Sequence, residues 1–264
     1  MVSNLIPLSN TLNVRRAIQP AANGHFSACA VARYYAALMD GGVVTSRYPS
    51  SSIPPLESQP TSDEVDIRIF TNPKGKIHDA FLGGGDYKGL TVPDGKFGLD
   101  FMRFNATDGS VIGVGHPGLG GSTGYCDLNN FAIVVTVNKL SLELLDRNMN
   151  TKWLYDSPVN SDVEAKLRRF LVESKNADRI LGIQVCAYKD GKVIIDTVAG
   201  VLGKDDPRPV QPNSLFPVFS VTKGVTAGMV HWLADKGKLK LEDNVANIWP
   251  EFGTNGKDQI KVTC

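Results

Sequence analysis

The segment LGIQVCAYKDGKVIIDTVAGV, residues 181–201, holds two apolar runs on either side of a turn signal. The turn is Lys189-Asp190-Gly191-Lys192, and β-branched residues lie on both sides of it. Asp-Gly between two such runs is typical of a β-hairpin, because a tight hairpin turn needs backbone torsions that Asp tolerates and Gly readily adopts. We therefore predict two adjacent antiparallel strands.

The first half of the chain is also rich in predicted strands. KFGLDFMRF (96–104) and SVIGVGHPG (110–118) flank the turn signal Asp108-Gly109, and STGYCDL (122–128) is followed by FAIVVTVN (131–138). The last of these segments is nearly all apolar, which is typical of a strand covered on both faces. We expect it to be central in its sheet.

Three segments have the spacing of amphipathic helices. The second of these segments, 161–174, opens with a capping box formed by Ser161 and Glu164, ahead of the apolar residues Val163, Leu167, Phe170 and Leu171. In the third segment, about 220–236, an apolar face is predicted at Val221, Val225, Gly228, Met229, Trp232 and Leu233. Glycines follow the first and third segments, as at many helix ends. The predicted helices are 25–40, 161–174 and about 220–236.

Two segments lack apolar periodicity. Residues 45–66 are rich in Ser and Pro and are predicted to form a surface loop without regular structure. Residues 141–160 are interpreted as a linker between two parts of the chain, 1–140 and 161–264.

Composition and charge indicate which partners and cofactors the chain is expected to lack. The chain has 264 residues, a net charge of +1 and 21% charged residues, without a basic stripe, so we expect no nucleic-acid partner. The four cysteines form no zinc-type spacing, and we expect neither metal nor cofactor; Cys186 is interpreted as a buried free thiol. With no secretory signal and no apolar run of membrane-spanning length, the expected location is intracellular, cytoplasmic or organellar, without membrane insertion.

Ser220 and Lys223 stand three residues apart where an apolar run turns into the third predicted helix. Residues so spaced are neighbours on one helix face, and the first-turn N–H groups of a helix have no partner within it. Burial and the positive helix end both favour the neutral form of a lysine amine, which can take the proton of a serine hydroxyl. The pair fits a nucleophile and its base. An S-x-x-K spacing arises about once by chance in such a chain, however, and an N-cap serine with a solvated lysine fits the spacing equally.

The wider segment LFPVFSVTKGVTAGMVHWLADKGKLKLEDNVANIWPEF (215–252) resembles the nucleophile region of class C β-lactamase-like serine hydrolases. That family includes β-lactamases, D-alanyl carboxypeptidases and esterases. The hairpin 181–201 resembles the strands before the nucleophile helix. The resemblance implies Ser220 as the acyl-forming nucleophile and Lys223 as its base. The stretch WLYDSPVNSDVEAKLRRFLVE is similar to the entry of such domains where they are fused to UbiB-type atypical kinases.

VGHPGLGGSTGYCDLNNFAIVVTVNK (114–139) resembles the third motif of the same family, where Lys-Thr-Gly or His-x-Gly is usual. The resemblance implies His116 as a further catalytic residue opposite the nucleophile, and Gly118 and Leu119 as substrate-binding residues, with the Leu119 N–H joining the Ser220 N–H in an oxyanion hole. Pro117 departs from the pattern because it offers neither a hydroxyl nor an N–H. His25, His78 and His231 are interpreted as ordinary structural residues.

The order of the motifs is reversed relative to the family. Residues 1–140 resemble the C-terminal part of a β-lactamase-like domain, and 161–264 resemble the N-terminal part. The middle part, which carries a Tyr-x-Asn motif in the family, has no counterpart here. One interpretation is a cut from a tandem array. The other, which we favour, is a permuted half-domain in which 131–138 pairs with 181–189 and helix 161–174 covers the sheet, because this buries strands that would otherwise be exposed.

The expected fold is therefore an α/β (α+β) arrangement, an antiparallel β-sheet flanked by helices, β-lactamase/transpeptidase-like but permuted and incomplete. The predicted function is hydrolysis of a small-molecule ester or amide through a Ser220 acyl-enzyme. The alternative is a catalytically inactive fragment that serves as a binding or interaction module. The substrate and the oligomeric state are not predicted.

Overall fold

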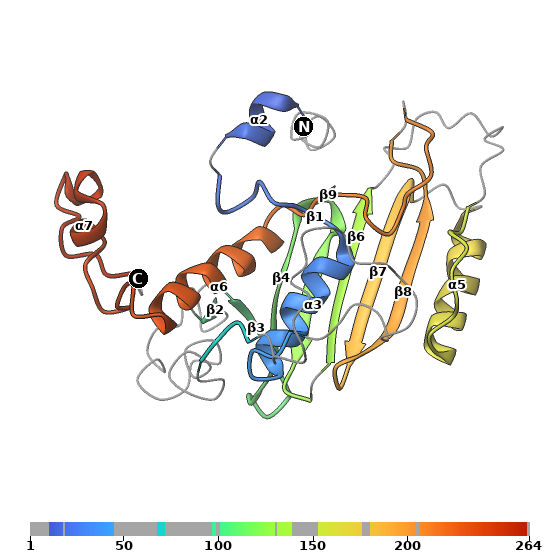
Figure 1. Cartoon of the computed structure of the whole chain (residues 1–264), viewed down its shortest axis with the longest axis horizontal. Helices are drawn as coiled ribbons and strands as arrows, with labels where there is room; N and C mark the ends of the chain where they lie inside the picture. The colour runs from blue at the N-terminus through green and yellow to red at the C-terminus, as the bar shows by residue number, and fades with distance from the viewer. Residues whose placement is uncertain are drawn as a thin grey trace, which may run out of the picture.

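The computed structural model describes residues 11–17, 19–44, 68–71, 97–98, 101–129, 131–138, 153–175, 180–203 and 206–262. Its centre is a seven-stranded sheet in the order β2-β3-β4-β5-β6-β7-β8, in which every neighbouring pair is antiparallel (Figure 1). The strands are β2 (Phe97–Gly98), β3 (Phe101–Asn105), β4 (Val111–Pro117), β5 (Thr123–Asp127), β6 (Phe131–Asn138), β7 (Gly182–Lys189) and β8 (Lys192–Gly200). The predicted loop 45–66, most of the predicted linker 141–160 and His78 lie outside the described residues.

The two halves of the chain meet at β6 and β7. The pairing runs without interruption from Phe131 opposite Lys189 to Asn138 opposite Gly182. This confirms the predicted pairing of 131–138 with 181–189. β6 alternates between the two faces of the sheet, with Val134 in one apolar cluster and Ile133 packed against the other. An almost entirely apolar strand is therefore stable here because both of its faces are covered.

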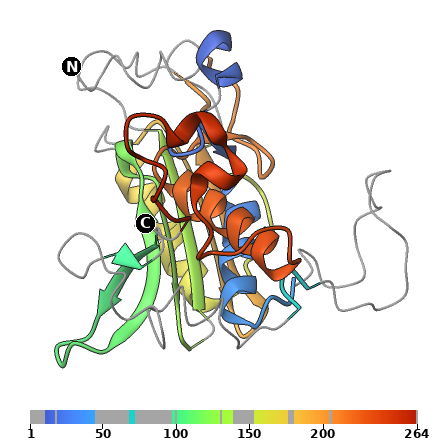
Figure 2. The same cartoon turned by 90° about the vertical axis from the view of Figure 1, so that its left-hand side faces the viewer.

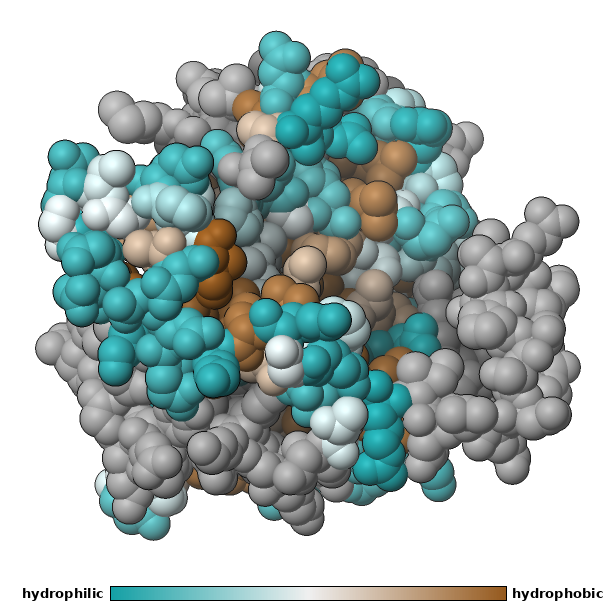
Figure 3. Space-filling view, turned by 60° about the vertical axis from the view of Figure 1, so that its left-hand side comes forward, coloured by the Kyte–Doolittle hydropathy of each residue, from teal (hydrophilic) through white to brown (hydrophobic). Residues whose placement is uncertain are grey.

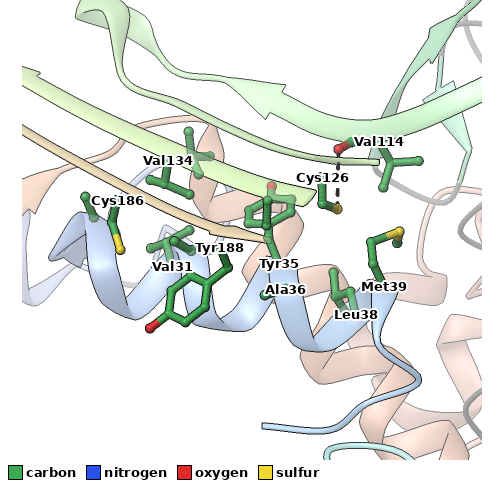
Figure 4. Packing of buried hydrophobic residues seen from close by; sticks show 14 of the residues in the cluster. Val31, Tyr35, Ala36, Leu38, Met39, Val114, Cys126, Val134, Cys186 and Tyr188 are labelled. Atoms are coloured by element: carbon green, nitrogen blue, oxygen red, sulfur yellow. Dashed lines mark hydrogen bonds between the residues drawn. The ribbon is translucent and has the colours of Figure 1, made fainter. Parts of the chain in front are cut away.

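Helix α3 (Ala28–Met39) covers one face of the sheet. Tyr35 is fully buried there, and its ring meets Phe101 of β3 edge-on with a centroid distance of 6.3 Å. Figure 4 shows this cluster, with Val134, Cys186 and Val114 of the sheet facing the helix. Cys186 is fully buried and unoxidised, as predicted.

The predicted start of this helix is wrong by three residues. His25 and Phe26 form strand β1, which pairs with β9 (Phe216–Pro217), and the helix begins only after Ser27. The Ser27 hydroxyl accepts a hydrogen bond from the Ala30 N–H at 3.3 Å, so this serine is the N-cap.

Helix α5 (Asp162–Lys175) covers the opposite face of the sheet (Figure 2), where Leu171 is buried against β7 and β8. The serine half of its predicted capping box is present, because the Ser161 hydroxyl accepts from the Glu164 N–H at 3.1 Å. The Glu164 carboxylate accepts from the Asn160 N–H, one residue before the position that the box predicts. Burial raises the pKa of Glu164, but hydrogen bonds from Thr197, Asn160 and Arg168 outweigh it, and the pKa lies below its ordinary value. The carboxylate therefore ties the helix start to β8 through Thr197.

Helix α6 (Val221–Asp235) crosses the sheet on the α3 side, over β4 and β3. The predicted apolar face of this helix is wrong in part, because Met229 is 64% and Trp232 42% exposed. The side in contact with the sheet instead carries small residues and one histidine. Tyr34 lies so close to Gly228 that a Cβ there would come within 1.9 Å of the tyrosine oxygen. Close packing by glycine thus replaces the expected packing by large side chains.

Further corrections follow from the packing of single residues. Val163 and Phe170 of α5, placed on its predicted apolar face, are 57% and 60% exposed. The segment predicted as one strand, 96–104, forms two strands, β2 and β3, which pair with each other. A glycine in the interior of a strand weakens it, and Gly98 lies at the end of β2.

The remaining described elements are short. They are α2 (Leu12–Arg16), the turn η3 (Leu119–Gly121), α7 (Val245–Ile248) and η4 (Pro250–Gly253). None of the helices within the described ranges combines the length and the apolar character that crossing a membrane requires.

Candidate active site

Ser220 lies at the junction between β9 and α6. Phe219, directly before it, has a φ of 48°, which is uncommon for a bulky residue and marks a sharp turn. Ser220 occupies the N-cap position of α6, but its side chain makes no capping hydrogen bond. The hydroxyl instead lies 3.0 Å from the Lys223 Nζ. This geometry therefore does not fit the alternative explanation of the spacing, in which Ser220 caps the helix and Lys223 is solvated.

The Lys223 amine has two partners. Its Nζ donates to the Ala21 carbonyl oxygen at 3.0 Å and lies at the same distance from the Ser220 Oγ. The side chain is half-buried rather than directed into bulk water. A lysine amine held by a carbonyl on one side can, when it is neutral, direct its lone pair at the serine hydroxyl.

A segment far away in the sequence fixes this lysine. We refer to residues 20–26 as the strap. The Pro20 carbonyl accepts from the Thr226 hydroxyl at 2.6 Å, and the Gly24 N–H donates to the Thr222 hydroxyl at 3.0 Å. The strap therefore lies along the first two turns of α6. In Figure 1 it runs from α2 into β1, beside β9.

The strap is a structural element beside the candidate site that the sequence did not reveal. It acts through the backbone carbonyls of Pro20 and Ala21, and any residue type supplies such groups. The Asn23-Gly24 pair is a turn signal, but no spacing relates it to Lys223.

The turn after β4 reaches the other side of the same junction. A Cβ on Gly118 would lie 2.3 Å from the Val218 carbonyl oxygen, so only glycine fits there without displacement. The Val218 N–H donates to the Gly24 carbonyl at 3.0 Å. Val218, two residues before Ser220, is thus held between the strap and the turn.

His116 lies at the end of β4, opposite Gly124 of β5. A Cβ on Gly124 would lie 3.2 Å from the Val221 side chain, so this part of the sheet touches the first residue of α6. His116 is buried, and its Nδ1–H donates to the Pro117 carbonyl at 2.7 Å, because a carbonyl oxygen can only accept. The His116 ring also lies 5.8 Å from the Phe97 ring.

Leu119 begins η3, and its side chain is 43% exposed. Within the described part of the chain, the backbone N–H groups of Leu119 and Ser220 donate to no other group. The structure thus brings all five predicted site residues, from both halves of the chain, to the region where α6 starts. Among the described residues no group of three or more potential metal ligands is present.

The comparisons with known proteins find similarity in the second half of the chain. Residues 167–263 match the protein-family model described as Beta-lactamase. This range contains Ser220 and Lys223 but not the turn with His116.

Among curated proteins, the chain is 39% identical over 84 residues to the esterase/beta-lactamase LipL of Mycobacterium tuberculosis, which covers 32% of this chain and 20% of that protein. It is 32% identical over 83 residues to a beta-lactamase of Pseudomonas fluorescens, covering 31% and 23% of the two chains. With the esterase EstB of Burkholderia gladioli it shares 26% identity over 92 residues, covering 35% and 24%. The matched segment thus spans about a fifth to a quarter of these relatives. No solved structure matches.

Proposed function

We propose that the chain is a serine hydrolase that cleaves a small-molecule ester or amide through an acyl-enzyme on Ser220. The observation that carries this proposal is the 3.0 Å contact between the Ser220 Oγ and the Lys223 Nζ, with the lysine held from behind by the Ala21 carbonyl. The match of residues 167–263 to the Beta-lactamase family and the names of the relatives support the same reaction class.

In the proposed reaction the neutral Lys223 amine takes the Ser220 proton while Oγ bonds to the substrate carbonyl carbon. The resulting oxyanion accepts hydrogen bonds from the Ser220 and Leu119 N–H groups. Lys223 then gives its proton to the leaving oxygen or nitrogen as the bond to carbon breaks. A water molecule, deprotonated by the same amine, then bonds to the acyl carbon; the bond to Oγ breaks, the acid leaves, and the amine returns the proton to Oγ.

His116 and Gly118 complete the proposed site from the other half of the chain. The His116 Nδ1–H holds the Pro117 carbonyl, and the absent side chain of Gly118 lets the turn approach Val218. Both residues thereby set where the Leu119 N–H lies relative to Ser220. Without them we expect the serine to remain but the oxyanion hole to be lost.

A binding or interaction module is the second candidate. Met229 and Trp232 of α6, together with Ile248 and Trp249 near α7, are exposed apolar side chains. Figure 3 shows brown, apolar groups exposed on the face that carries these helices. Exposed apolar patches often mark interaction surfaces.

A fluorophosphonate probe separates the two candidates. The folded wild-type chain should be labelled at Ser220, and Ser220→Ala should abolish labelling. Ser110, whose hydroxyl bonds Asp108 in an exposed turn, supplies the matched control Ser110→Ala, which should label like wild type. Absence of label at Ser220 in a chain that is folded by circular dichroism would exclude the hydrolase and leave the binding module.

A further inference from the structure

A buried glutamine of the main sheet is hydrogen-bonded to both chain segments that lead into the candidate site. Gln184 of β7 lies opposite Thr136 of β6 and is 2% exposed. Its Oε1 accepts from the Ala28 N–H at 2.9 Å and from the Thr136 hydroxyl at 3.3 Å. Its Nε2 donates to the Gln211 carbonyl at 2.8 Å and to the Ser214 carbonyl at 3.1 Å. An amide has two N–H donors and one oxygen that accepts twice, so all of its capacity is used.

The backbone partners fix which way this amide points. An N–H group faces Oε1 and two carbonyl oxygens face Nε2. The reverse orientation would set donor against donor and acceptor against acceptor at these three contacts. Loss of the side-chain amide would leave one N–H and two carbonyls without it in a place that is closed to water, which is unfavourable.

These backbone partners stand at the ends of the strap and of β9. Ala28 follows the last strap residue by two positions, and Ser214 precedes the first residue of β9 by two. The strap supplies the carbonyl that accepts from Lys223, and β9 continues directly into the turn that carries Ser220. One amide group therefore holds the segment behind the lysine and the segment before the serine at a fixed separation.

The direct pairing between the two segments is short. β1 and β9 are paired over two residues each, from His25 opposite Pro217 to Phe26 opposite Phe216. A two-stranded pair of this length is only marginally stable by itself. The relative position of the strap and β9 therefore depends on additional contacts, and the contacts of Gln184 connect both segments to β7.

We propose that Gln184 is a positioning residue for the Ser220–Lys223 pair, through its hold on the strap and on the chain entering β9. The inference rests on the function proposed above. It adds a residue outside the candidate site on which the reactivity of Ser220 depends.

Gln184→Met tests this role, because methionine has a similar length and volume but lacks the amide donors and acceptor. The strap and β9 can then shift relative to each other, and a displacement of about 1 Å costs an active site about 100-fold in rate. Fluorophosphonate labelling of Ser220 in the folded variant should slow by about 10- to 100-fold. Thr136→Val is the matched control. It removes a hydrogen bond to the same Oε1 but touches neither segment, so it should label at the wild-type rate.

A double-mutant cycle separates positioning from a general loss of stability. The Thr226 hydroxyl holds the same strap through the Pro20 carbonyl. Thr226→Val should therefore slow labelling by a smaller factor in Gln184→Met than in wild type, because the strap is already loose there. In Thr136→Val it should keep its full effect. Equal factors in all three backgrounds would mean that Gln184 does not act through the strap.

Ala28→Pro breaks the same contact from the other partner. Ala28 is the first residue of α3, where proline is favoured because the N–H there has no partner within the helix. Ser27 already has the extended backbone that a following proline requires, with φ −80° and ψ 150°. The variant therefore removes the N–H that Gln184 binds and keeps the helix. It should slow labelling too, and it decides the matter if Gln184→Met does not fold.

Labelling at the wild-type rate in either folded variant would overturn the inference and leave the hydrolase in place. Absence of label on Ser220 in the wild-type chain would instead overturn the proposed function. Circular dichroism of each variant, recorded under the labelling conditions, establishes that the compared chains are folded.

Discussion

The β6–β7 seam and the junction around Ser220 both join the two halves of the chain, but by different means. The seam is a continuous antiparallel ladder with apolar clusters on both faces. The junction depends on a few individual contacts. The Ala21 carbonyl accepts from Lys223, the Pro20 carbonyl accepts from Thr226, and Gly118 packs against the Val218 carbonyl. The seam buries most of the apolar surface that joins the halves, whereas the junction buries little and holds individual groups in position. We therefore expect stability to depend mainly on the seam and reactivity mainly on the junction.

A charge in the seam should have the largest effect. Val134 of β6 is 1% exposed, and Val134→Asp would bury an unpaired carboxylate. We expect a loss of several kcal/mol, comparable to the total stability of a domain, so that the chain unfolds at room temperature. Circular dichroism during urea denaturation measures this. Val159→Asp, at a site 52% exposed, is the control, and an equal denaturation midpoint for the two variants would contradict the central role of the seam.

His231 on the sheet side of α6 should make stability depend on pH. Burial lowers the pKa of His231 to about 4, below the ordinary value of 6.5. The unfolded chain therefore takes up a proton at this residue before the folded chain does, and stability is lost as pH falls from about 6.5 to 4. The loss amounts to at most about 3 kcal/mol. Urea titrations at pH 7 and pH 4.5 should show a smaller pH difference for His231→Gln than for wild type; an identical difference would remove this histidine as the cause.

Gly118→Ala should separate the junction from the seam. The added Cβ would lie 2.3 Å from the Val218 carbonyl, so the turn must move away from Ser220. We expect a stability loss of about 1–3 kcal/mol and a much larger relative loss of fluorophosphonate labelling. Gly203→Ala, where the nearest atom would be 3.6 Å away, is the matched control. Labelling of Gly118→Ala at the wild-type rate would show that the turn has no part in the site.

Thr226→Val should have the smallest effect on stability. It removes the hydroxyl that donates to the Pro20 carbonyl, a net loss of about 1 kcal/mol. The strap should loosen, so that Lys223 is held less well and labelling of Ser220 slows. Thr226→Ser keeps the donor and should restore the rate. Equal rates in the valine and serine variants would mean that the strap does not position the lysine.

The same contrast explains what the sequence could predict. The seam follows from β6, whose run of apolar residues needs cover on two faces, and from the Asp190-Gly191 turn that aligns β7 with β8. The cap that Ser161 forms with the Glu164 N–H is a local pattern and is present. Such features depend on residue types close together in the sequence, which is why they could be predicted.

The rest depends on contacts that residue type does not specify. The Lys223–Ala21 bond uses a backbone carbonyl about two hundred positions away. The buried side of α6 carries mainly small residues and His231, so a helical face defined by the large apolar residues Met229 and Trp232 was predicted wrongly. Ser220 and Lys223 were identified as a pair, but only the three-dimensional structure distinguishes a hydroxyl facing the amine from one that caps the helix.

The most direct test of the whole account is the first turnover with p-nitrophenyl hexanoate, followed by stopped-flow absorbance and by mass spectrometry of acid-quenched protein. An activated Ser220 predicts a burst approaching one p-nitrophenol per chain when deacylation is slow, with the hexanoyl group on the peptide that contains Ser220. Lys223→Met should abolish both signals. Release of p-nitrophenol without acylation of that peptide, or the same acylation rate in Lys223→Met, would contradict the account.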